Sequence, residues 1–379
     1  MSYDALDASR TQRTLTTTAR LLLALHLDGP LFIGLCLLVG VGTIVLYSAS
    51  GGNIAMLKAK ALHFSLALVV MVALAQVPPR MIRIAAPWAY MTGLALLIAV
   101  MLTGDIAMGA QRWLDLGIVR FQPSELMKIA VPLACAWYLH ERALPPSLPT
   151  TLALGIAIVI PTALIAEQPD LGTALLVAAA GGMVVLLAGL RLRYILCAIG
   201  LLIPLAYVAW KFLLHDYQRQ RVLTFLDPQN DPLGAGYHII QSQIAIGSGG
   251  VFGKGYLRGS QAQLEFLPER STDFIFAVIG EEWGLLGLLT LLLLFMFVIG
   301  RALYLAASAQ DTFARLASGS FALTFCVYVF VNSGMVIGLL PVVGVPLPLV
   351  SYGGTAMVTL MAGFGILMSL CAKRKLVSR

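Results

Sequence analysis

The feature that most constrains this chain is a series of apolar runs, each long enough to cross a membrane as a helix. A spanning helix needs about 20 predominantly apolar residues. Ten candidate runs lie near residues 31–49, 59–77, 84–103, 124–140, 149–167, 172–190, 194–214, 274–300, 314–340 and 350–371. Charged residues make up only 11% of the 379 residues, against roughly 25% in soluble domains. The sequence therefore predicts an all-α polytopic membrane protein with about ten transmembrane helices, in one integral membrane domain covering residues 1–379.

The basic residues of the connections fall almost entirely on one side of the predicted bundle. They are Arg10, Arg13, Arg20, Arg80, Arg83, Arg142, Arg191, Arg193, Arg301, Arg315, Lys373, Arg374, Lys375 and Arg379. Cytoplasmic connections are enriched in Lys and Arg, so we expect both termini, including residues 1–29, in the cytoplasm. Lys58 and Lys60 are exceptions on the outer face. A long polar loop, 215–273, then lies outside between the seventh and eighth spans, with the connections near 104–123, 168–171 and 341–349.

Cysteine positions and charge exclude several classes of site. The five cysteines lie in or beside apolar runs without metal-ligand spacing, so neither a disulfide framework nor a zinc site is expected. The net charge of +7 comes from basic residues at span ends, which does not indicate nucleic-acid binding. The apolar run 21–27 is too short for a cleavable signal peptide, and an interfacial helix is the favoured role for this segment.

Two aspartates lie where outer connections enter apolar helices. Asp273 ends the charged run 267–273 and leads directly into the eighth span. A carboxylate at the mouth of a span is costly, because burial disfavours its charged form, so a functional role is the default interpretation. Asp170 lies in the tight turn between the fifth and sixth spans. For both residues the alternative is a simple helix cap.

Further charged residues gather at the same outer ends. Glu125 and Lys128 open the fourth span and, being three residues apart, share a helix face and can form an ion pair. A well-capped helix with a surface ion pair is the alternative. Arg112, beside Trp113, is suited either to binding an anion through its guanidinium fork or to anchoring a lipid headgroup.

Four other segments carry weaker signals. The glycine-rich run 247–255 fails the phosphate-loop pattern and is expected to be a flexible turn, after a polar surface helix at 234–243. The three prolines of 340–349 forbid a continuous helix, so this run is expected to re-enter the membrane from outside or to pack over an outer cavity, and an ordinary connection is the alternative. Glu281 and Glu282, within the eighth span, are expected to bond polar partners or face an internal wet site.

Together these motifs resemble the SEDS family, the shape, elongation, division and sporulation proteins of bacteria. The resemblance covers nearly the whole chain from about residue 30, and the runs 255–269 and 339–348 favour the elongation branch over the division branch. The motifs that carry it are Gln122-Pro123-Ser124-Glu125 with Lys128, Gln168 to Thr173, Leu267-Pro268-Glu269, Thr272-Asp273-Phe274, and Val350-Ser351-Tyr352-Gly353-Gly354.

The resemblance implies a ten-helix inner-membrane glycosyltransferase that polymerises lipid II into glycan strands outside the cytoplasmic membrane. It also implies a class B penicillin-binding protein as crosslinking partner, together with other membrane proteins of the elongation complex. Carried onto this chain, the catalytic residue of the family is Asp273, and its functional polar residues are Glu125, Lys128 and Asp170.

The chemistry can also be argued from the residues. Joining sugars from a polyprenyl-pyrophosphate donor requires a base for the acceptor hydroxyl, a role that fits Asp273. It also requires positive charge at the leaving pyrophosphate, which Arg112, Lys128, and Arg219 or Arg221 could supply. A divalent cation, Mg²⁺ or Mn²⁺, held by carboxylates is a further option left open.

Two rival functions are a flippase for lipid-linked precursors and a non-catalytic scaffold. A flippase would be expected to carry basic residues near the membrane midplane, whereas the charged residues here lie at the outer rim. That distribution favours the enzyme. A scaffold would tolerate neutralisation of the rim carboxylates.

Overall fold

The structure is a computed structural model, and it describes most of the chain between residues 25 and 372. Within that range it does not describe residues 104, 108–109, 116–119, 192, 195, 198–199, 201–203, 205–206, 214–215, 231–233, 265 and 268. The proposed interfacial helix before residue 25 lies outside the described residues, as does part of the predicted seventh span, 194–214.

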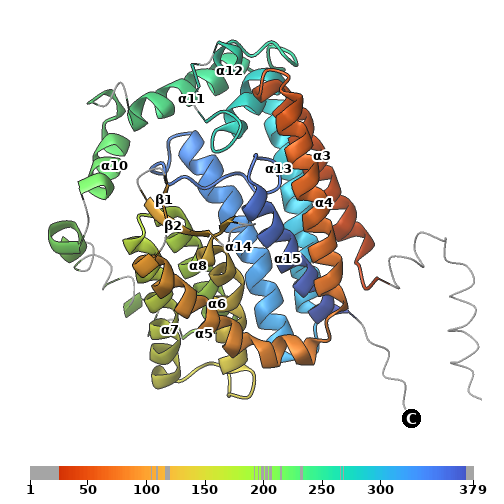
Figure 1. Ribbon diagram of the computed structural model, residues 1–379, viewed down its shortest axis with the longest axis vertical. Helices are drawn as coiled ribbons and strands as arrows, with labels where there is room; N and C mark the ends of the chain where they lie inside the picture. Colours follow the sequence, from red (N-terminus) through yellow and green to blue (C-terminus); the bar gives the residue numbers. More distant parts are fainter. Residues whose placement is uncertain are drawn as a thin grey trace, which may run out of the picture.

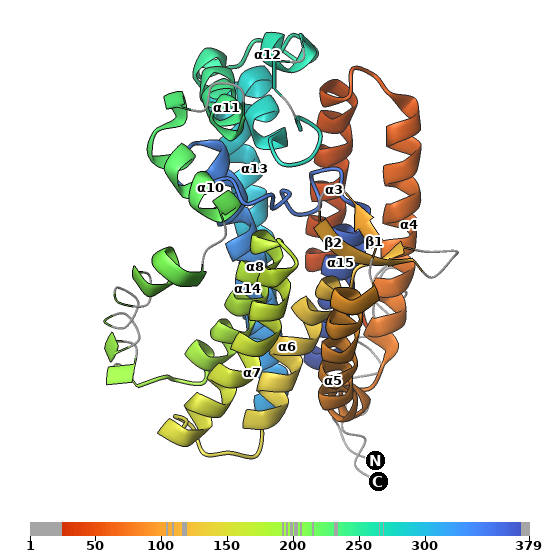
Figure 2. The ribbon, with the colours of Figure 1, turned by 60° about the vertical axis from the view of Figure 1, so that its left-hand side comes forward.

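Helices dominate the described part (Figure 1). The long helices are α3 (Gly29–Ala49), α4 (Ile54–Gln76), α5 (Pro79–Thr103), α6 (Pro123–Leu139), α7 (Leu148–Glu167), α8 (Leu171–Leu187), α13 (Ile275–Ala307), α14 (Thr312–Val336) and α15 (Gly354–Cys371). Between α8 and α13 lie a π-helical turn (Ala209–Leu213), α10 (Asp216–Leu226), a 3₁₀ turn (Pro228–Asn230), α11 (Ala235–Gly249) and α12 (Ser260–Gln263). Helices α10, α11 and α12 cover one end of the bundle (Figure 2).

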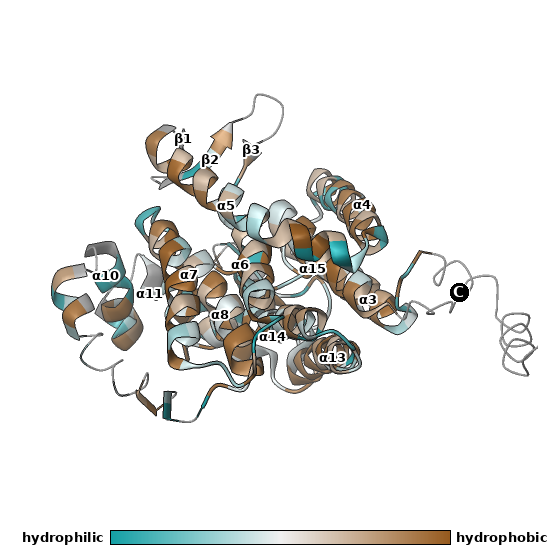
Figure 3. Ribbon diagram, turned by 90° about the horizontal axis from the view of Figure 1, so that it is seen from below, coloured by the Kyte–Doolittle hydropathy of each residue, from teal (hydrophilic) through white to brown (hydrophobic). Residues whose placement is uncertain are grey.

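The long helices confirm the predicted apolar runs. Seven of them, α3, α4, α5, α7, α13, α14 and α15, are long and apolar enough to cross a membrane. The 17-residue helices α6 and α8 coincide with two further runs. Hydrophobic residues extend along most of these helices (Figure 3). Many large hydrophobic side chains of these helices are exposed, where a water-soluble protein would carry polar residues. The described chain is therefore a polytopic, mainly helical bundle.

The connection 104–123 adds a small sheet to the predicted all-α bundle. It contains three short antiparallel strands in the order β1 (Asp105–Ala107), β2 (Ala110–Asp115) and β3 (Arg120–Phe121). Strand β2 is central and pairs with β3 through Leu114 and Phe121. The sheet was not predicted because strands of two to six residues carry too little periodicity to be recognised. Their pairing satisfies backbone groups beside α5 and α6.

Helix α13 is interrupted at Gly284, whose φ of 66° and ψ of −161° are not helical. The break leaves backbone groups without intrahelical partners, and the glycine-rich run 247–255 supplies those partners. The carbonyls of Glu281 and Glu282 accept hydrogen bonds from the N–H groups of Lys254 and Gly255, both at 3.0 Å. In return, the N–H groups of residues 285 and 286 donate to the carbonyls of residues 250 and 251, at 3.0 and 3.1 Å.

The expectation of a flexible turn at 247–255 was therefore wrong. The run is a packed plug in the break of α13, and its backbone lies directly against that of the helix. Gly284 has no room for a side chain, because a Cβ there would collide with the backbone of Gly253 and Val251. The preceding polar helix was correctly predicted and corresponds to α11.

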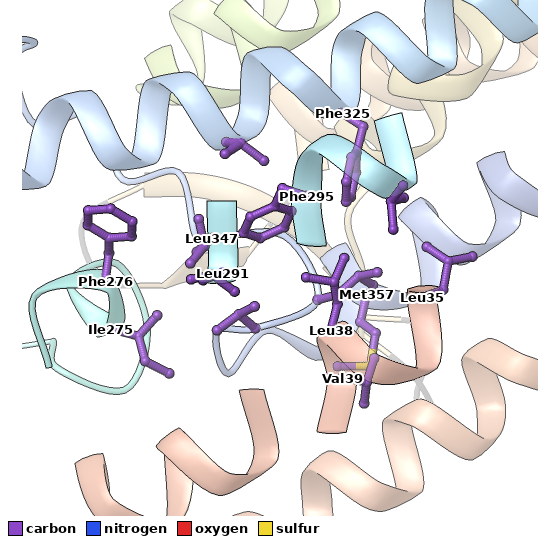
Figure 4. Packing of buried hydrophobic residues seen from close by; sticks show 14 of the residues in the cluster. Leu35, Leu38, Val39, Ile275, Phe276, Leu291, Phe295, Phe325, Leu347 and Met357 are labelled. Atoms are coloured by element: carbon purple, nitrogen blue, oxygen red, sulfur yellow. The ribbon is translucent and has the colours of Figure 1, made fainter. Parts of the chain in front are cut away.

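The main hydrophobic core joins α3, α13, α14 and α15 with the segment 341–353. In the core, Leu38 and Val39 of α3 point toward Met357 of α15, and Leu291 of α13 lies beside Leu347 (Figure 4). Because the non-helical segment contributes Leu347 and Val350 to this core, it is fixed in the interior and is not a loose connection.

Candidate active site

The backbone that carries Asp273 is held from two sides. On one side, the side-chain amide of Asn332 in α14 donates to the carbonyl of Asp273 at 2.8 Å. On the other side, the hydroxyl of Ser351 donates to the carbonyl of Thr272 at 2.5 Å, and the N–H of Tyr352 donates to the carbonyl of Ser271 at 2.9 Å. The position of the Asp273 carboxylate is thus set by α14 and by the turn before α15.

The carboxylate of Asp273 does not cap α13. The N-cap of that helix is Phe274, which makes no side-chain capping hydrogen bond, so the capping alternative was wrong. The pKa of Asp273 is raised from 3.8 to about 6, chiefly because of burial and secondly because of the charge of Glu269, while the charge of Arg221 opposes the rise. A carboxylate with a pKa near neutrality is well matched to accepting a proton from a hydroxyl group.

The proline-rich segment before α15 lies directly beside this carboxylate. Gly344 has a φ of 73°, and a Cβ at that position would be 3.6 Å from Oδ2 of Asp273. The amide of Asn332 also donates to the carbonyl of Val345 at 2.8 Å, and Nη1 of Arg221 donates to the carbonyl of Val342 at 3.3 Å. The segment 340–349 is therefore packed beside Asp273 and Arg221, whereas its placement over an outer cavity stays a prediction.

Glu125 and Lys128 form the predicted ion pair, with 2.6 Å between Nζ and Oε1. It is not a surface pair, since each residue is only 8% exposed. Nζ of Lys128 also lies 5.5 Å from the centre of the Tyr328 ring. The second oxygen of Glu125, Oε2, is buried and has no hydrogen-bond partner within the described part of the chain. An unsatisfied buried acceptor of this kind calls for a water or ligand donor.

Asp170 and Arg112 organise the turn between α7 and α8. Oδ1 of Asp170 accepts from the N–H of Thr173 at 3.1 Å, so the capping interpretation of Asp170 is confirmed. Its Oδ2 accepts from Nε2 of Gln122 at 3.0 Å. Arg112 donates through Nε to the carbonyl of Gln168 at 3.1 Å and through Nη2 to that of residue 169. Two nitrogens of Arg112 are thus engaged with the backbone, and its role in binding an anion stays a prediction.

These groups converge on the segment 341–353 from different helices. Tyr328 and Asn332 lie one turn apart on α14, so Lys128 and the Asp273 backbone contact one face of the same helix. Gly172, two residues after Asp170, approaches the carbonyl of residue 343 so closely that a Cβ would lie 2.6 Å from it. Sequence reasoning missed Tyr328 and Asn332. The signal for Asn332 was a lone amide deep in the apolar run 314–340.

The described residues contain no group of three or more His, Cys, Asp or Glu side chains that could hold a metal ion. A divalent cation at Asp273 would therefore need substrate phosphate oxygens and water among its ligands. This is how Mg²⁺ is commonly bound beside phosphates.

The expectation for Glu281 and Glu282 is confirmed, since both are buried and bonded. Oε1 of Glu281 accepts from Nζ of Lys254 at 2.7 Å, from the hydroxyl of Ser260 at 3.1 Å and from the N–H of residue 261 at 3.0 Å. Glu282 accepts from the hydroxyl of Ser48 in α3. These contacts fasten α12 and the glycine-rich plug to α13 and α3.

Comparison with known proteins agrees with this geometry. The chain matches the model of the cell cycle protein family of FtsW, RodA and SpoVE over residues 22–376. This chain belongs to the FtsW/RodA/SpoVE family. The resemblance drawn from its motifs is thereby confirmed.

One relative of this chain is the peptidoglycan glycosyltransferase MrdB of Escherichia coli K12. The two sequences are 55% identical over 354 residues, which cover 93% of this chain and 96% of MrdB. A probable peptidoglycan glycosyltransferase FtsW of Geobacter metallireducens is 37% identical over 74% of this chain and 75% of its own length. The higher identity to MrdB agrees with the elongation branch.

Solved structures show the same fold. One is a chain of a peptidoglycan synthase complex, described for its structural coordination of polymerization and crosslinking, with a TM-score of 0.79 and 31% identity over 91% of this chain and 97% of that chain. Another is the rod shape determining protein RodA of Thermus thermophilus, with a TM-score of 0.69 and 29% identity over 92% and 97% of the two chains.

Proposed function

We propose that this chain is a peptidoglycan glycosyltransferase that polymerises lipid II into glycan strands on the outer side of the cytoplasmic membrane during cell elongation. The observation that carries the proposal is the Asp273 carboxylate. It is half-buried, its pKa is raised to about 6, and its backbone is fixed by Asn332 and by the turn before α15. The relatives named as peptidoglycan glycosyltransferases support the reaction class.

In the proposed reaction Asp273 acts as general base. Its carboxylate accepts the proton of the acceptor sugar hydroxyl, and the hydroxyl oxygen forms a bond to the anomeric carbon of the donor sugar. The bond between that carbon and the pyrophosphate oxygen breaks, and the lipid pyrophosphate leaves with its electron pair. A base with a pKa near 6 is mostly ionised at neutral pH and is regenerated when the proton passes to solvent.

The pyrophosphate needs positive charge where it departs. Arg221 is the nearest candidate, since its charge acts on Asp273 and it binds the carbonyl of Val342. Lys128 is a second candidate, because it lies beside Tyr328, one turn of α14 from the Asn332 that holds the Asp273 backbone. We assign Glu125, Lys128, Asp170 and Arg112 to the substrate-binding wall, with Asp170 and Arg112 shaping the outer turn.

We propose ten membrane spans, with both termini in the cytoplasm and the site facing outward. The seven long apolar helices, the shorter α6 and α8, and the run 194–214 account for the ten. The outer loop 215–273 belongs to this arrangement, because α10 to α12 cover the end of the bundle at which α13 begins (Figures 1 and 2).

The proposed partners are lipid II, a class B penicillin-binding protein that crosslinks the product, and other membrane proteins of the elongation complex. The similarity to a chain of a solved peptidoglycan synthase complex supports a crosslinking partner.

The test is polymerisation of purified lipid II by this chain in detergent or nanodiscs, with glycan length measured on gels. A parallel assay follows lipid II crossing in sealed vesicles that contain the same protein. Glycan chains without lipid II crossing are the expected result. Lipid II crossing without polymerisation would instead establish the flippase function.

A further inference from the structure

Lys60 is a buried charged residue of α4 that the proposed reaction does not use. Although α4 presents much of its surface outward, Lys60 is only 2% exposed. None of the salt bridges among the described residues involves it. Nζ of Lys60 donates instead to the backbone carbonyl of Val350, at 2.6 Å. Burying an ammonium without an acidic partner is costly, so a single carbonyl contact requires an explanation.

The contact lies where α3, α4 and the turn before α15 meet. A Cβ on Gly42 of α3 would lie 2.5 Å from Cα of Val350 and 2.9 Å from Nζ of Lys60. One turn further along α4, His63 lies against the start of α15, since a Cβ on Gly354 would be 2.7 Å from its Nε2. The Lys60 side chain therefore lies between α3 and the turn before α15, with Nζ bonded to the carbonyl of Val350.

That turn is the one that holds the catalytic segment. Val350 is followed by Ser351, whose hydroxyl donates to the carbonyl of Thr272, and by Tyr352, whose N–H donates to the carbonyl of Ser271. The hydroxyl of Ser351 also accepts from the N–H of Leu347 at 2.9 Å. A continuous set of contacts thus runs from Lys60 through residues 350–352 to the residues just before Asp273.

We infer that Lys60 is a positioning residue for the proposed glycosyl transfer. Its ammonium fixes the 350–352 turn, and the turn fixes the backbone from which the Asp273 carboxylate projects. The catalytic consequence rests on the proposed function, whereas the mechanical coupling between Lys60 and residues 271–273 does not. Since small displacements of a reacting group cost much rate, loss of this contact acts on turnover while substrate binding is kept.

The experiment compares the wild-type protein with Lys60→Met, which keeps the aliphatic length and removes the donor. The matched control is Lys58→Met, since Lys58 is exposed on the same helix two residues away. Hydrogen exchange measured by mass spectrometry reports on peptides covering 266–274 and 345–353. Polymerisation of lipid II gives kcat and KM separately.

We expect both peptides to exchange hydrogen faster in Lys60→Met than in the wild-type protein. In Lys58→Met both peptides should exchange at the wild-type rate. We also expect kcat to fall on the order of 10–100-fold with KM little changed. If Lys60→Met does not accumulate, Lys60→Gln, which retains a shorter donor, carries the same two measurements and is expected to show smaller effects of the same sign.

Unchanged exchange in Lys60→Met, or a raised KM with normal kcat, would overturn the inference, the second result by indicating direct substrate contact. Absence of polymerisation by the wild-type protein would contradict the proposed function instead. In that case hydrogen exchange alone decides whether Lys60 holds the 266–274 segment.

Discussion

Asn332 in the middle of an apolar helix donates its side-chain amide to the backbone carbonyl of Asp273 at 2.8 Å. The same nitrogen donates to the carbonyl of Val345 at 2.8 Å. One buried amide therefore joins the segment that carries Asp273 to the proline-rich segment that flanks the carboxylate. Asn332 thus holds two non-helical segments together, although it lies in a long apolar helix.

Replacing Asn332 with Leu should lower both stability and activity. The substitution removes two donors and leaves two carbonyls unpaired, which costs about 1–3 kcal/mol per unsatisfied group. Thermal unfolding of the purified protein and lipid II polymerisation measure the two effects. The control is Ser333→Ala, because the Ser333 hydroxyl bonds only to carbonyls of its own helix. Equal loss in both variants would show that Asn332 has no special relation to Asp273.

Asp273→Asn should abolish polymerisation without impairing folding. An amide keeps the size of the side chain but accepts no proton, and general-base catalysis typically contributes about 10²–10⁴-fold. Because the pKa is raised from 3.8 to about 6 on folding, this carboxylate lowers the stability of the folded protein as the pH rises from 3.8 to about 6, and the loss is complete above that. The variant should therefore unfold at an equal or higher temperature at pH 7.5. Near-normal turnover of the pure variant would remove Asp273 from the mechanism.

The rate should fall as the pH is lowered through about 6, since only the ionised form of Asp273 accepts a proton. The charged groups near Asp273 are Glu269 and Arg221, and His238 stacks on the neighbouring Phe274 at 5.7 Å between ring centres. Glu269 raises the pKa of Asp273 and Arg221 lowers it. Glu269→Gln should therefore move the acid limb to lower pH, and Arg221→Gln should move it to higher pH.

The measurement is the pH dependence of kcat for the wild type and both variants. Shifts in the same direction for Glu269→Gln and Arg221→Gln would be incompatible with direct action of these charges on Asp273. An acid limb that persists unchanged in both variants would assign it to another group.

Reversing Glu125 or Lys128 singly should inactivate the enzyme, and the double exchange should restore activity only in part. Removing one partner of a buried pair costs about 3–5 kcal/mol, and here both partners are buried. The exchange restores the pair but places a carboxylate where Lys128 faces Tyr328 and the proposed phosphate site. Polymerisation and membrane abundance are measured together. Full recovery of turnover by the double variant would limit this pair to a structural role.

A class B penicillin-binding protein should raise polymerisation without adding catalytic groups, by ordering the outer segments. Lipid II turnover is compared for the chain alone, with the intact partner, and with a partner whose transpeptidase serine is mutated. We expect equal stimulation by the two forms of the partner. Stimulation that disappears with the serine mutant would mean that crosslinking itself drives polymerisation.

The sequence predicted the spans well because each apolar run is long. The runs near 59–77 and 149–167, for example, correspond to α4 and α7 within a few residues. Asp273 could be selected from sequence as a candidate, since a charged run that passes directly into a span is a local signal. The contacts of Asn332 and Lys60 were not predictable, because their partners lie 59 and 290 residues away along the chain.

The break in α13 at Gly284 is occupied by the backbone of residues 250–255, which takes up the four hydrogen-bonding groups that the break exposes. A kink left open would act as a joint, whereas this one is filled and cannot bend without breaking those bonds. The segment 250–255 is thus joined to α13 by backbone hydrogen bonds on both sides of the break. If a neighbouring protein in the bilayer tilts α13, then α11 and α12 will move with it as one rigid unit.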